Sequence, residues 1–417
     1  MHQMAKRKYF MEMKILRNAD EFMLLRTEWD RILRENNSEN FYLSFEWFYY
    51  ILHCSKNPPK NLYLIVFKKS ERTAAIIPCC IVHKHLRFFD VNSFEIIGNI
   101  YSAFKGGIVL KGEENEVAEK FLAHLTETKS NDWDIIDFEY ISPSDPFIAA
   151  LKAAAKKRKL KNLQTDPFAN LKLDLSLFSN SEEYFRSMGK NHRRNIVKRI
   201  NKLNREGEFD IVCIAHNADN LSVMMEHFYA VYDESWKKKD IDPRFHARLA
   251  EHLAARGKLR LFLLCFRPDS ADSRKNGNAK KFSSYQSCIQ NFTGFNENFI
   301  PIAALFYVKS GDTVYALKTA YSEKYSDYSP GTVLWWFSIK YLLETDKCRR
   351  LDFQKGDEDY KFKFGGMVDE TYIRYQVANP KLLYAIFEIF FECYIIPTMK
   401  RIVKSDLGDM FYRVFRK

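Results

Sequence analysis

Residues 314–336, VYALKTAYSEKYSDYSPGTVLWW, combine a strand pattern, a polar turn and the start of a helix. At the helix start, Ser329 is a suitable N-cap, Pro330 has the φ angle of a first helical position, and Gly331 has no side chain to block access. Unpaired N–H groups at such a start bind anions, although an ordinary helix cap has the same sequence. A strand over 350–353 is expected after the helix.

The segment that follows, LDFQKGDEDYKFKFGG at 351–366, gathers charged side chains and a phenol at the end of a short apolar strand. Asp352 lies inside the strand, and Glu358, Tyr360 and Lys361 come soon after it. Burial in an apolar strand raises the pKa of a carboxyl group towards the range in which it can accept a proton. The segment is therefore predicted to be a catalytic site with Asp352 as the first candidate for the proton acceptor. The alternative is a structural Asp that accepts backbone hydrogen bonds or pairs with Lys361.

Helix-like and strand-like segments alternate twice along the chain, which predicts an α/β (α+β) fold with two lobes whose mixed sheets are flanked by helices. We expect the first lobe to span 1–165 and the second 166–380. A flexible insert is expected at 267–298, because this polar connection is far longer than a usual loop. Residues 381–417 are expected to form a basic amphipathic helical tail, either packed on the second lobe or lying on an anionic membrane surface. The expected helices include Asp20–Glu35, Phe45–His53 with its cap at Ser44, and Tyr184–Arg205 with a cap at Ser181.

The composition fits a folded, multidomain protein with an anionic partner, since the chain has 417 residues, 46% apolar residues and a formal net charge of +12. Its eight cysteines are scattered and include no CxxC pair, so neither a disulfide framework nor a zinc site is expected. An apolar signal core and an uncharged apolar window of about 18 residues are both absent, which predicts a cytoplasmic protein. Motifs of serine hydrolases, zinc proteases and nucleotide triphosphatases are also absent.

Four pieces of sequence in order resemble the acetyltransferase domain of the cellulose-biosynthesis (CelD/BcsL) type in the GNAT superfamily. The resemblance covers roughly 182–364. The N-terminal stretch WDRILRENNSENFYLSFEWFYYIL at 29–52 also resembles the start of the first, degenerate GNAT-like lobe of that family and of the Fem-type aminoacyl transferases. The four pieces are MGKNHRRNIVKRINKL at 188–203, YDESWKKKD at 232–240, YSDYSPGTVLWW at 325–336 and LDFQKGDEDYKFKFG at 351–365.

The resemblance implies two tandem GNAT-like lobes and transfer of an acyl group from acyl-CoA, such as acetyl-CoA, to an amine or hydroxyl acceptor without a metal. In proteins of this fold the donor lies along the strand before the phosphate-binding helix. The strand that ends at Tyr321 would then line the donor, and its pyrophosphate would bind at Ser329, Pro330, Gly331 and Thr332.

Further residues have roles only through this resemblance, each with an ordinary structural alternative. Glu234 is the second candidate for the proton acceptor, and Tyr360 and Lys361 are candidate donors to the developing oxyanion. Trp236 is expected to form a wall of the acceptor pocket, although a core position is the alternative. A basic run is expected to bind phosphates of the donor or an anionic acceptor, and its alternative is a solvated helix face. Glu358 is a further candidate for binding the substrate. The basic run consists of His192, Arg193 and Arg194.

The leading hypothesis is an acyl-CoA-dependent N- or O-acyltransferase that acts on a sugar or glycoconjugate in polysaccharide or cell-surface glycoconjugate biosynthesis. A second hypothesis is an aminoacyl-tRNA-dependent transferase of the Fem type, because the net charge of +12 suits contacts with tRNA phosphates. Apart from that alternative, nucleic acid is not an expected partner of the enzyme. A third is a non-catalytic basic scaffold that binds nucleic acid or membrane. If the tail contacts lipid, the protein would lie at the inner face of the membrane.

Overall fold

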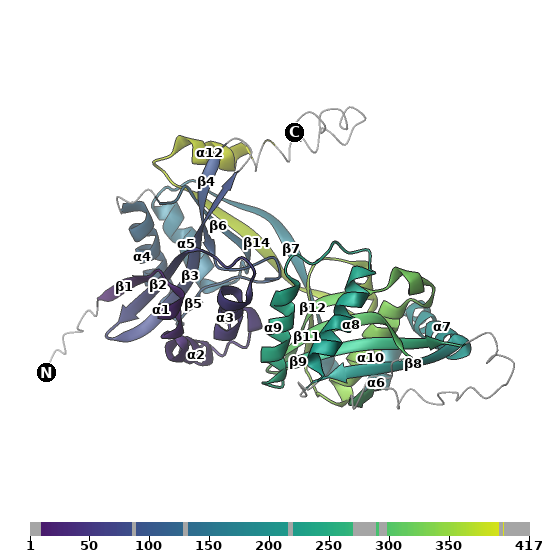
Figure 1. The fold of residues 1–417 in the computed structure, drawn as a ribbon. Helices are drawn as coiled ribbons and strands as arrows, with labels where there is room; N and C mark the ends of the chain where they lie inside the picture. The colour runs from purple at the N-terminus through teal and green to yellow at the C-terminus, as the bar shows by residue number, and fades with distance from the viewer. Residues whose placement is uncertain are drawn as a thin grey trace. The chain divides into compact units, whose positions relative to one another are not determined.

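The computed structural model describes residues 10–85, 89–127, 132–215, 220–269, 289–291, 298–391 and 395, which form two compact units (Figure 1). Unit 1 comprises the described parts of 1–53, 57–168 and 371–417, and unit 2 those of 54–56 and 169–370. The insert predicted at 267–298 and the tail predicted at 381–417 lie largely outside the described residues. Residues 371–378, which the sequence placed with the second lobe, belong to unit 1 because they pair with a strand there.

Unit 1 contains a mixed sheet with the strand order β1-β2-β3-β4-β6-β14, and β5 pairs with β3. Neighbouring strands are antiparallel except β4 and β6, which run parallel and are connected through α4. Side chains of α4 and α5 join the strands in one apolar core. The elements are β1 (Met11–Leu16), α1 (Ala19–Met23), α2 (Arg26–Glu35), η1 (Phe41–Leu43), α3 (Phe45–Cys54), β2 (Asn61–Lys69), β3 (Arg72–His85), β4 (Asp90–Ile96), β5 (Ile108–Val109), α4 (Glu114–Glu127), β6 (Ile135–Ile141), α5 (Pro146–Lys157), β14 (Met367–Ala378) and α12 (Leu383–Phe390).

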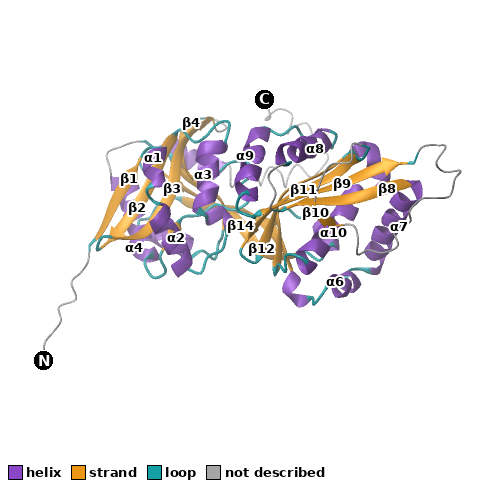
Figure 2. Cartoon of the chain, turned by 60° about the horizontal axis from the view of Figure 1, so that its bottom comes forward, coloured by secondary structure: helices purple, strands orange, loops and turns teal. Residues whose placement is uncertain are grey.

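Unit 2 contains strands in the order β7-β13-β12-β11-β9-β8-β10. Both β7 and β14 have residues in each unit, since the units divide the chain after 168 and after 370. The pairs β12/β13 and β8/β10 are parallel and the other pairs are antiparallel. Figure 2 shows α8 and α9 on one side of these strands and α6, α7 and α10 on the other. The elements are β7 (Asn162–Asp174), η2 (Leu175–Leu177), α6 (Ser181–Ser187), α7 (Lys190–Glu206), β8 (Gly207–Ile214), α8 (Leu221–Asp233), α9 (Pro243–Ala254), β9 (Leu259–Pro268), β10 (Ile289–Asn291), β11 (Ile300–Ser310), β12 (Thr313–Tyr321), η4 (Glu323–Tyr328), α10 (Pro330–Glu344), β13 (Arg350–Lys355) and α11 (Asp359–Lys363).

The two units share one plan. In each, three antiparallel strands are followed by a crossover helix and a parallel strand, because parallel neighbours need such a connection. In unit 1 the strands are β2, β3, β4 and β6, and α4 connects the last two. In unit 2 they are β9, β11, β12 and β13, and α10 connects the last two. The predicted fold class, mixed sheets flanked by helices in two lobes, is confirmed.

Two predicted helices are interrupted in the structure. The helix predicted over Tyr184–Arg205 is two helices, α6 and α7, which separate at Met188 and Gly189. The N-cap of α6 is Asn180 rather than Ser181, and its side chain accepts the N–H of Glu183 at 2.9 Å. Similarly, the predicted Asp20–Glu35 helix is broken between α1 and α2. Both breaks depend on the local backbone conformation, which the periodicity of apolar residues does not predict.

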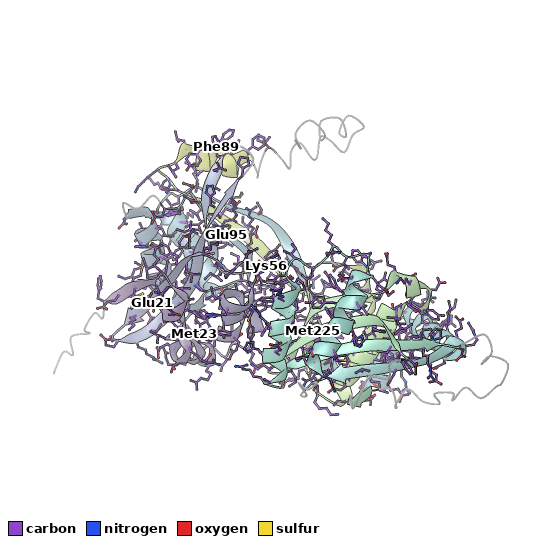
Figure 3. All side chains as sticks on the ribbon, in the orientation of Figure 1. Glu21, Met23, Lys56, Phe89, Glu95 and Met225 are labelled. Atoms are coloured by element: carbon purple, nitrogen blue, oxygen red, sulfur yellow. The ribbon has the colours of Figure 1, made fainter. Side chains whose placement is uncertain are left out.

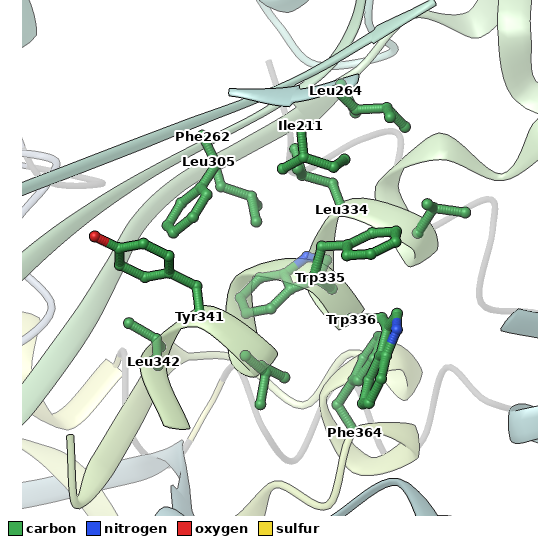
Figure 4. Packing of buried hydrophobic residues seen from close by; sticks show 14 of the residues in the cluster. Ile211, Phe262, Leu264, Leu305, Leu334, Trp335, Trp336, Tyr341, Leu342 and Phe364 are labelled. Atoms are coloured by element: carbon green, nitrogen blue, oxygen red, sulfur yellow. The ribbon is translucent and has the colours of Figure 1, made fainter. Parts of the chain in front are cut away.

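The core of unit 2 explains why α10 is fixed firmly against the strands. Every residue from Val333 to Leu343 is buried, so this helix is covered on all sides. Trp335 and Trp336 reach towards Phe364, and Phe262 and Leu305 from β9 and β11 cover the other side (Figure 4). On the opposite face, Phe228 of α8 packs against Phe306 of β11 with ring centroids 6.1 Å apart. Met225, which Figure 3 labels, is a buried residue of the same helix. The start of α10 thus belongs to a helix whose body is fixed in the core of unit 2.

Cysteines, membrane-spanning helices and metal-binding groups can be described for the residues that the structure includes. Cys54, Cys79, Cys80, Cys213, Cys265 and Cys348 are buried free thiols, whereas Cys288 and Cys393 lie outside the described residues. No helix of the described chain has the length and apolar run needed to cross a membrane. Within the same residues, no group of three or more His, Cys, Asp or Glu side chains is arranged to hold a metal ion.

Candidate active site

The parallel strands β12 and β13 pair only at their beginnings, although β12 continues to Tyr321 and β13 to Lys355. On its other side β12 has a β-bulge, because its register with β11 shifts and leaves Leu317 as an extra residue. A bulge bends and twists the strand that carries it. The paired residues are Thr313 with Arg350, Val314 with Leu351 and Tyr315 with Asp352. The strands therefore part after Asp352, at their carboxyl ends, where open α/β sheets bind ligands.

Helix α10 begins at Pro330, as the sequence predicts. Ser329 precedes it with a left-handed backbone, φ 47° and ψ 53°, and its carbonyl accepts the N–H of Thr332 at 3.0 Å. Its side chain makes no capping hydrogen bond, so the hydroxyl that was predicted to cap the helix is not used for that purpose. Among the described residues, the amide of Gly331 has no hydrogen-bond acceptor either.

Gly331 also sets how closely the helix start approaches β12. A Cβ atom at this position would lie 3.3 Å from Cδ1 of Tyr321, which is tighter than most such contacts. A glycine therefore lets the two elements meet without displacing the ring, and it leaves the amide uncovered by a side chain. Tyr321, Ser329, Pro330, Gly331 and Thr332, all predicted to bind the donor, come together at one place.

The basic helix α7 contacts the segment that leads into α10. Arg199 Nη1 donates to the carbonyl of Asp327 at 2.5 Å, and the Lys202 ammonium lies 4.7 Å from the Tyr328 ring centroid. Tyr328 in turn donates from its hydroxyl to Glu206 Oε2 at 2.8 Å. Positive charge from α7 is thus placed along η4, immediately before the helix start.

The residues predicted at the beginning of α7 have different surroundings. Arg193 is half-buried and Arg194 exposed, and neither makes an ion pair within the described chain. His192 packs edge-on against Phe364 with centroids 4.6 Å apart, and its buried Nε2 has no hydrogen-bond partner there. Burial, followed by the charge of Lys363, lowers the pKa of His192. No hydrogen bond or ion pair within the described residues joins these three side chains to 329–332.

Asp352 is the buried carboxyl group at the point where the strands part, and only 4% of the residue is exposed. Burial raises its pKa, and Lys172, the Gln354 amide and Asn170 oppose that shift. The Gln354 N–H donates to Oδ1 at 2.8 Å and Asn170 Nδ2 donates to Oδ2 at 3.3 Å. Lys172 Nζ lies 4.0 Å from Oδ2. Asp352 therefore has both properties that the sequence left open: a raised pKa and structural hydrogen bonds.

Lys361 has a structural role at the end of β13. Its ammonium, which is almost fully buried, donates to the carbonyls of Lys355 at 2.9 Å and Gly356 at 3.2 Å. It also pairs with Glu358 Oε2 at 2.8 Å rather than with Asp352. These contacts leave little capacity for an oxyanion. Tyr360 packs on Trp335 with centroids 5.5 Å apart, and burial raises its pKa, so its hydroxyl stays protonated.

Glu234, the C-cap residue of α8, connects that helix to the end of β12. Its carboxylate accepts from Ser322 Oγ at 2.6 Å and also binds Lys324. The hydrogen bonds from Lys324 and Ser322 lower its pKa, which makes Glu234 a weaker base than Asp352. Trp236, two residues later, is 65% exposed, so the core position considered for it is wrong.

A group of charged residues near the end of β12 was not predicted. Lys318, next to the bulge, is buried and binds Asp240 Oδ2, and its ammonium lies 4.3 Å from the Tyr232 ring centroid. Asp240 Oδ2 is also 3.4 Å from Nδ1 of the fully buried His246. Burial lowers the pKa of Lys318 and brings that of His246 to about 4, both against the influence of Asp240. The piece YDESWKKKD, which contains Tyr232 and Asp240, was the signal in the sequence for this group.

The corresponding place in unit 1 has a different chemistry. β4 and β6 also pair over two positions only, Ser93 with Ile135 and Phe94 with Ile136. The helix that follows β4, α4, has Glu114 and Glu116 in its first turn instead of a Ser-Pro-Gly start. Because carboxylates repel phosphate, the start of α4 is poorly suited to a pyrophosphate.

A cavity of about 440 Å³ lies near the other end of α10. Trp336 and Lys340 contribute to its wall, together with residues from the beginning of α6. None of the residues predicted for the site lines this cavity. Its lining consists of Asn180, Ser181, Glu182, Phe185, Trp336, Lys340 and Glu344.

The chain is similar to known proteins in part of its sequence and in its fold. Residues 190–269 and 299–362 match the family model described as an acetyltransferase (GNAT) domain. A tandem GNAT protein from the clavulanic acid biosynthesis pathway superposes with a TM-score of 0.50 at 12% identity, covering 89% of this chain and 99% of that chain. A conserved protein of unknown function from Bacteroides thetaiotaomicron has a TM-score of 0.51 at 10% identity, covering 88% and 100%. FemX gives 0.48 at 14% identity, covering 90% and 100%. No curated protein matches the chain.

The family match runs from α7 to α11 and so includes the helix start, the parted strands and Asp352. The tandem GNAT protein and the Bacteroides thetaiotaomicron protein share the fold across both units, since they cover 89% and 88% of the chain. A large part of unit 2 therefore matches the model of a GNAT acetyltransferase domain, and the chain has the fold of a tandem GNAT protein.

Proposed function

We propose that the chain is an acyl-CoA-dependent N- or O-acyltransferase of the cellulose-biosynthesis type, acting on a sugar or glycoconjugate in polysaccharide or cell-surface glycoconjugate biosynthesis. One observation carries this proposal: β12 and β13 part beside the uncapped start of α10, inside the segment that matches the acetyltransferase family. The proposal includes a cytoplasmic location, with membrane contact by the tail as its variant.

The donor would bind along β12 with its pyrophosphate at the start of α10. The Gly331 amide and the Ser329 hydroxyl offer hydrogen bonds there, and the helix start contributes a partial positive charge. Arg199 and Lys202 add positive charge along η4. The residues present thus fit a diphosphate group.

Acyl transfer needs the acceptor nitrogen or oxygen to attack the thioester carbonyl carbon, after which the carbon–sulfur bond breaks and CoA leaves as its thiol. Orientation of both substrates and removal of one proton from the acceptor supply most of the rate. Asp352 is the preferred proton acceptor because burial raises its pKa, whereas hydrogen bonds lower that of Glu234. Tyr360 is the preferred donor to the oxyanion because Lys361 is occupied by backbone carbonyls.

The test compares two glycines at helix starts. Gly331→Glu places charge and bulk where the pyrophosphate is expected, and Gly189→Glu makes the same change at the start of α7, where a new Cβ meets open space. We expect calorimetry to show acetyl-CoA binding to the wild type and to Gly189→Glu, with at least a roughly tenfold loss for Gly331→Glu, as like charges repel. Equal affinity of the three proteins, or none, would overturn the proposal.

One observation favours a second candidate, an aminoacyl-tRNA-dependent transferase. The outer surface of α7 has several exposed or half-buried cations, among them Arg194, Lys198 and Arg205. Such a surface suits phosphate contacts, whose affinity falls steeply with salt. Salt-sensitive binding of tRNA without any binding of acetyl-CoA would favour this candidate. If neither ligand binds, a non-catalytic scaffold becomes the better description.

A further inference from the structure

The segment between α8 and α9, residues 234–242, is held against β12 at both of its ends. Before it, the Tyr232 ring lies 4.3 Å from the Lys318 ammonium, and near its end Asp240 binds the same ammonium. Glu234 accepts from Ser322 Oγ at 2.6 Å and fixes the beginning of the segment. Lys237 lies in the middle of this segment, which is therefore fixed at the carboxyl end of β12.

The positive charges at this place outnumber the carboxylates that pair with them. Lys318 pairs with Asp240, and Lys361 pairs with Glu358 at 2.8 Å. Lys237 is half-buried and has no ion pair within the described chain. Of these three lysines, Lys237 is thus the one without a carboxylate partner in the described chain.

The surroundings of Lys237 oppose its charge. The pKa of Lys237 is lowered to about 8, mainly by burial and next by the neighbouring charge of Lys318. Glu358 raises this pKa, and Lys361 lowers it by a smaller amount. A partly desolvated cation beside two like charges is unfavourable unless an anion joins it. Trp236, the neighbouring residue, is 65% exposed and offers an apolar surface at the same place.

We propose that Lys237 and Lys318 bind an anionic group of the acceptor substrate, a carboxylate or a phosphate, beside the separated ends of β12 and β13. That this group belongs to an acceptor rests on the proposed acyltransferase function. The anion would supply the missing counter-charge of Lys237. Trp236 would contact an apolar face of the same molecule.

The experiment measures how fast acetic anhydride labels each lysine in the wild-type protein. Cleavage after Glu234 places Lys237, Lys238 and Lys239 in one peptide, so the exposed Lys238 and Lys239 are internal controls. We expect labelling of Lys237 to show a midpoint near 8, well below the usual lysine value, while the two controls report the intrinsic reactivity of the reagent at each pH.

Inorganic phosphate or acetate is then added at pH 8, with sodium chloride at equal ionic strength as the screening control. A bound anion that raises the pKa of Lys237 by about one unit would slow its labelling roughly fivefold, because only the neutral amine reacts. Lys238 and Lys239 should keep their rates. No selective protection of Lys237 by either anion would overturn the proposal.

A parallel titration with CoA separates the two sources of an anion. Protection of Lys237 by phosphate or acetate that persists with saturating CoA supports an acceptor group. If CoA alone protects Lys237, or abolishes the effect of the anions, the lysine serves the donor and the acceptor assignment is wrong. Calorimetry with acetyl-CoA reports separately on the donor site, so a failure of the proposed function remains distinguishable. Lys237→Gln should lose the anion-dependent rise in Tm, and Lys239→Gln should retain it.

Discussion

Replacing Lys237 by methionine is expected to stabilise unit 2 in the absence of ligand. The pKa of this lysine falls from its usual value of 10.5 to about 8 because of burial and the nearby charge of Lys318. At about 1.4 kcal/mol for each tenfold change in ionisation, this corresponds to about 3 kcal/mol against the charged form. Because the ammonium retains partial access to water, we expect roughly half of it, about 1–2 kcal/mol. Methionine has a similar shape and no charge, so it removes this penalty.

The pH dependence has a definite sign. Below the folded pKa of about 8 the lysine is charged in both states, and the penalty on the folded state is fully present. Between 8 and 10.5 the folded protein has lost the proton that the unfolded chain retains, so stability of the wild type rises with pH relative to the variant. The advantage of Lys237→Met should fall to about a quarter near pH 10.

Calorimetry at pH 7 and pH 10, without phosphate or carboxylate in the buffer, measures this effect. For a unit of this size, about 1–2 kcal/mol corresponds to a rise in Tm of roughly 3–6 °C at pH 7. Lys238→Met, at the exposed neighbouring position, is the matched control and should change stability by less than about 0.5 kcal/mol. A lower Tm for Lys237→Met at pH 7, or an equal gain at both pH values, would refute the reasoning.

Three further predictions concern the base, the donor count and unit 1. Asp352→Asn should keep the affinity for acetyl-CoA but lower the rate of acyl transfer by about 10²–10⁴-fold. It should also remove the decline of the wild-type rate at acidic pH, which a pH–rate profile measures. Each chain should bind one acetyl-CoA, because the start of α4 is acidic; native mass spectrometry that finds two would contradict this. Arg374→Ala should destabilise unit 1 by about 1–3 kcal/mol in urea unfolding, since the buried Asp137 loses its 2.6 and 2.7 Å hydrogen bonds but keeps the Lys84 ion pair at 2.8 Å. Lys157→Ala, which breaks an exposed ion pair, should cost at most about 1 kcal/mol by the same assay.

Features that depend on neighbouring residues could be predicted from the sequence. Pro330 and Gly331 mark the start of α10 because their backbone preferences act locally. The burial of Asp352 follows from its short apolar strand. The parallel pair and its crossover helix follow from the strand–helix–strand order.

Features that depend on contacts between distant segments could not be predicted. The ammonium of Lys361 binds carbonyls near Gln354, whose φ of 68° redirects the chain, and no sequence pattern announces that turn. Lys237 and Lys318 come from two different elements, and only the folded chain brings their charges together. The hydroxyl of Ser329 is a good cap by residue type, but the left-handed backbone of that residue directs it elsewhere.

The return of β14 to unit 1 has a consequence for biosynthesis. Residues from 371 onwards pair with β6 at the edge of unit 1, whereas the whole of unit 2 precedes them in the chain. A ribosome that adds 5–20 amino acids per second would need about 10–40 s to make the roughly 200 intervening residues. During that interval the nascent N-terminal unit has an unfilled sheet edge, to which chaperones or a neighbouring polysome product could bind.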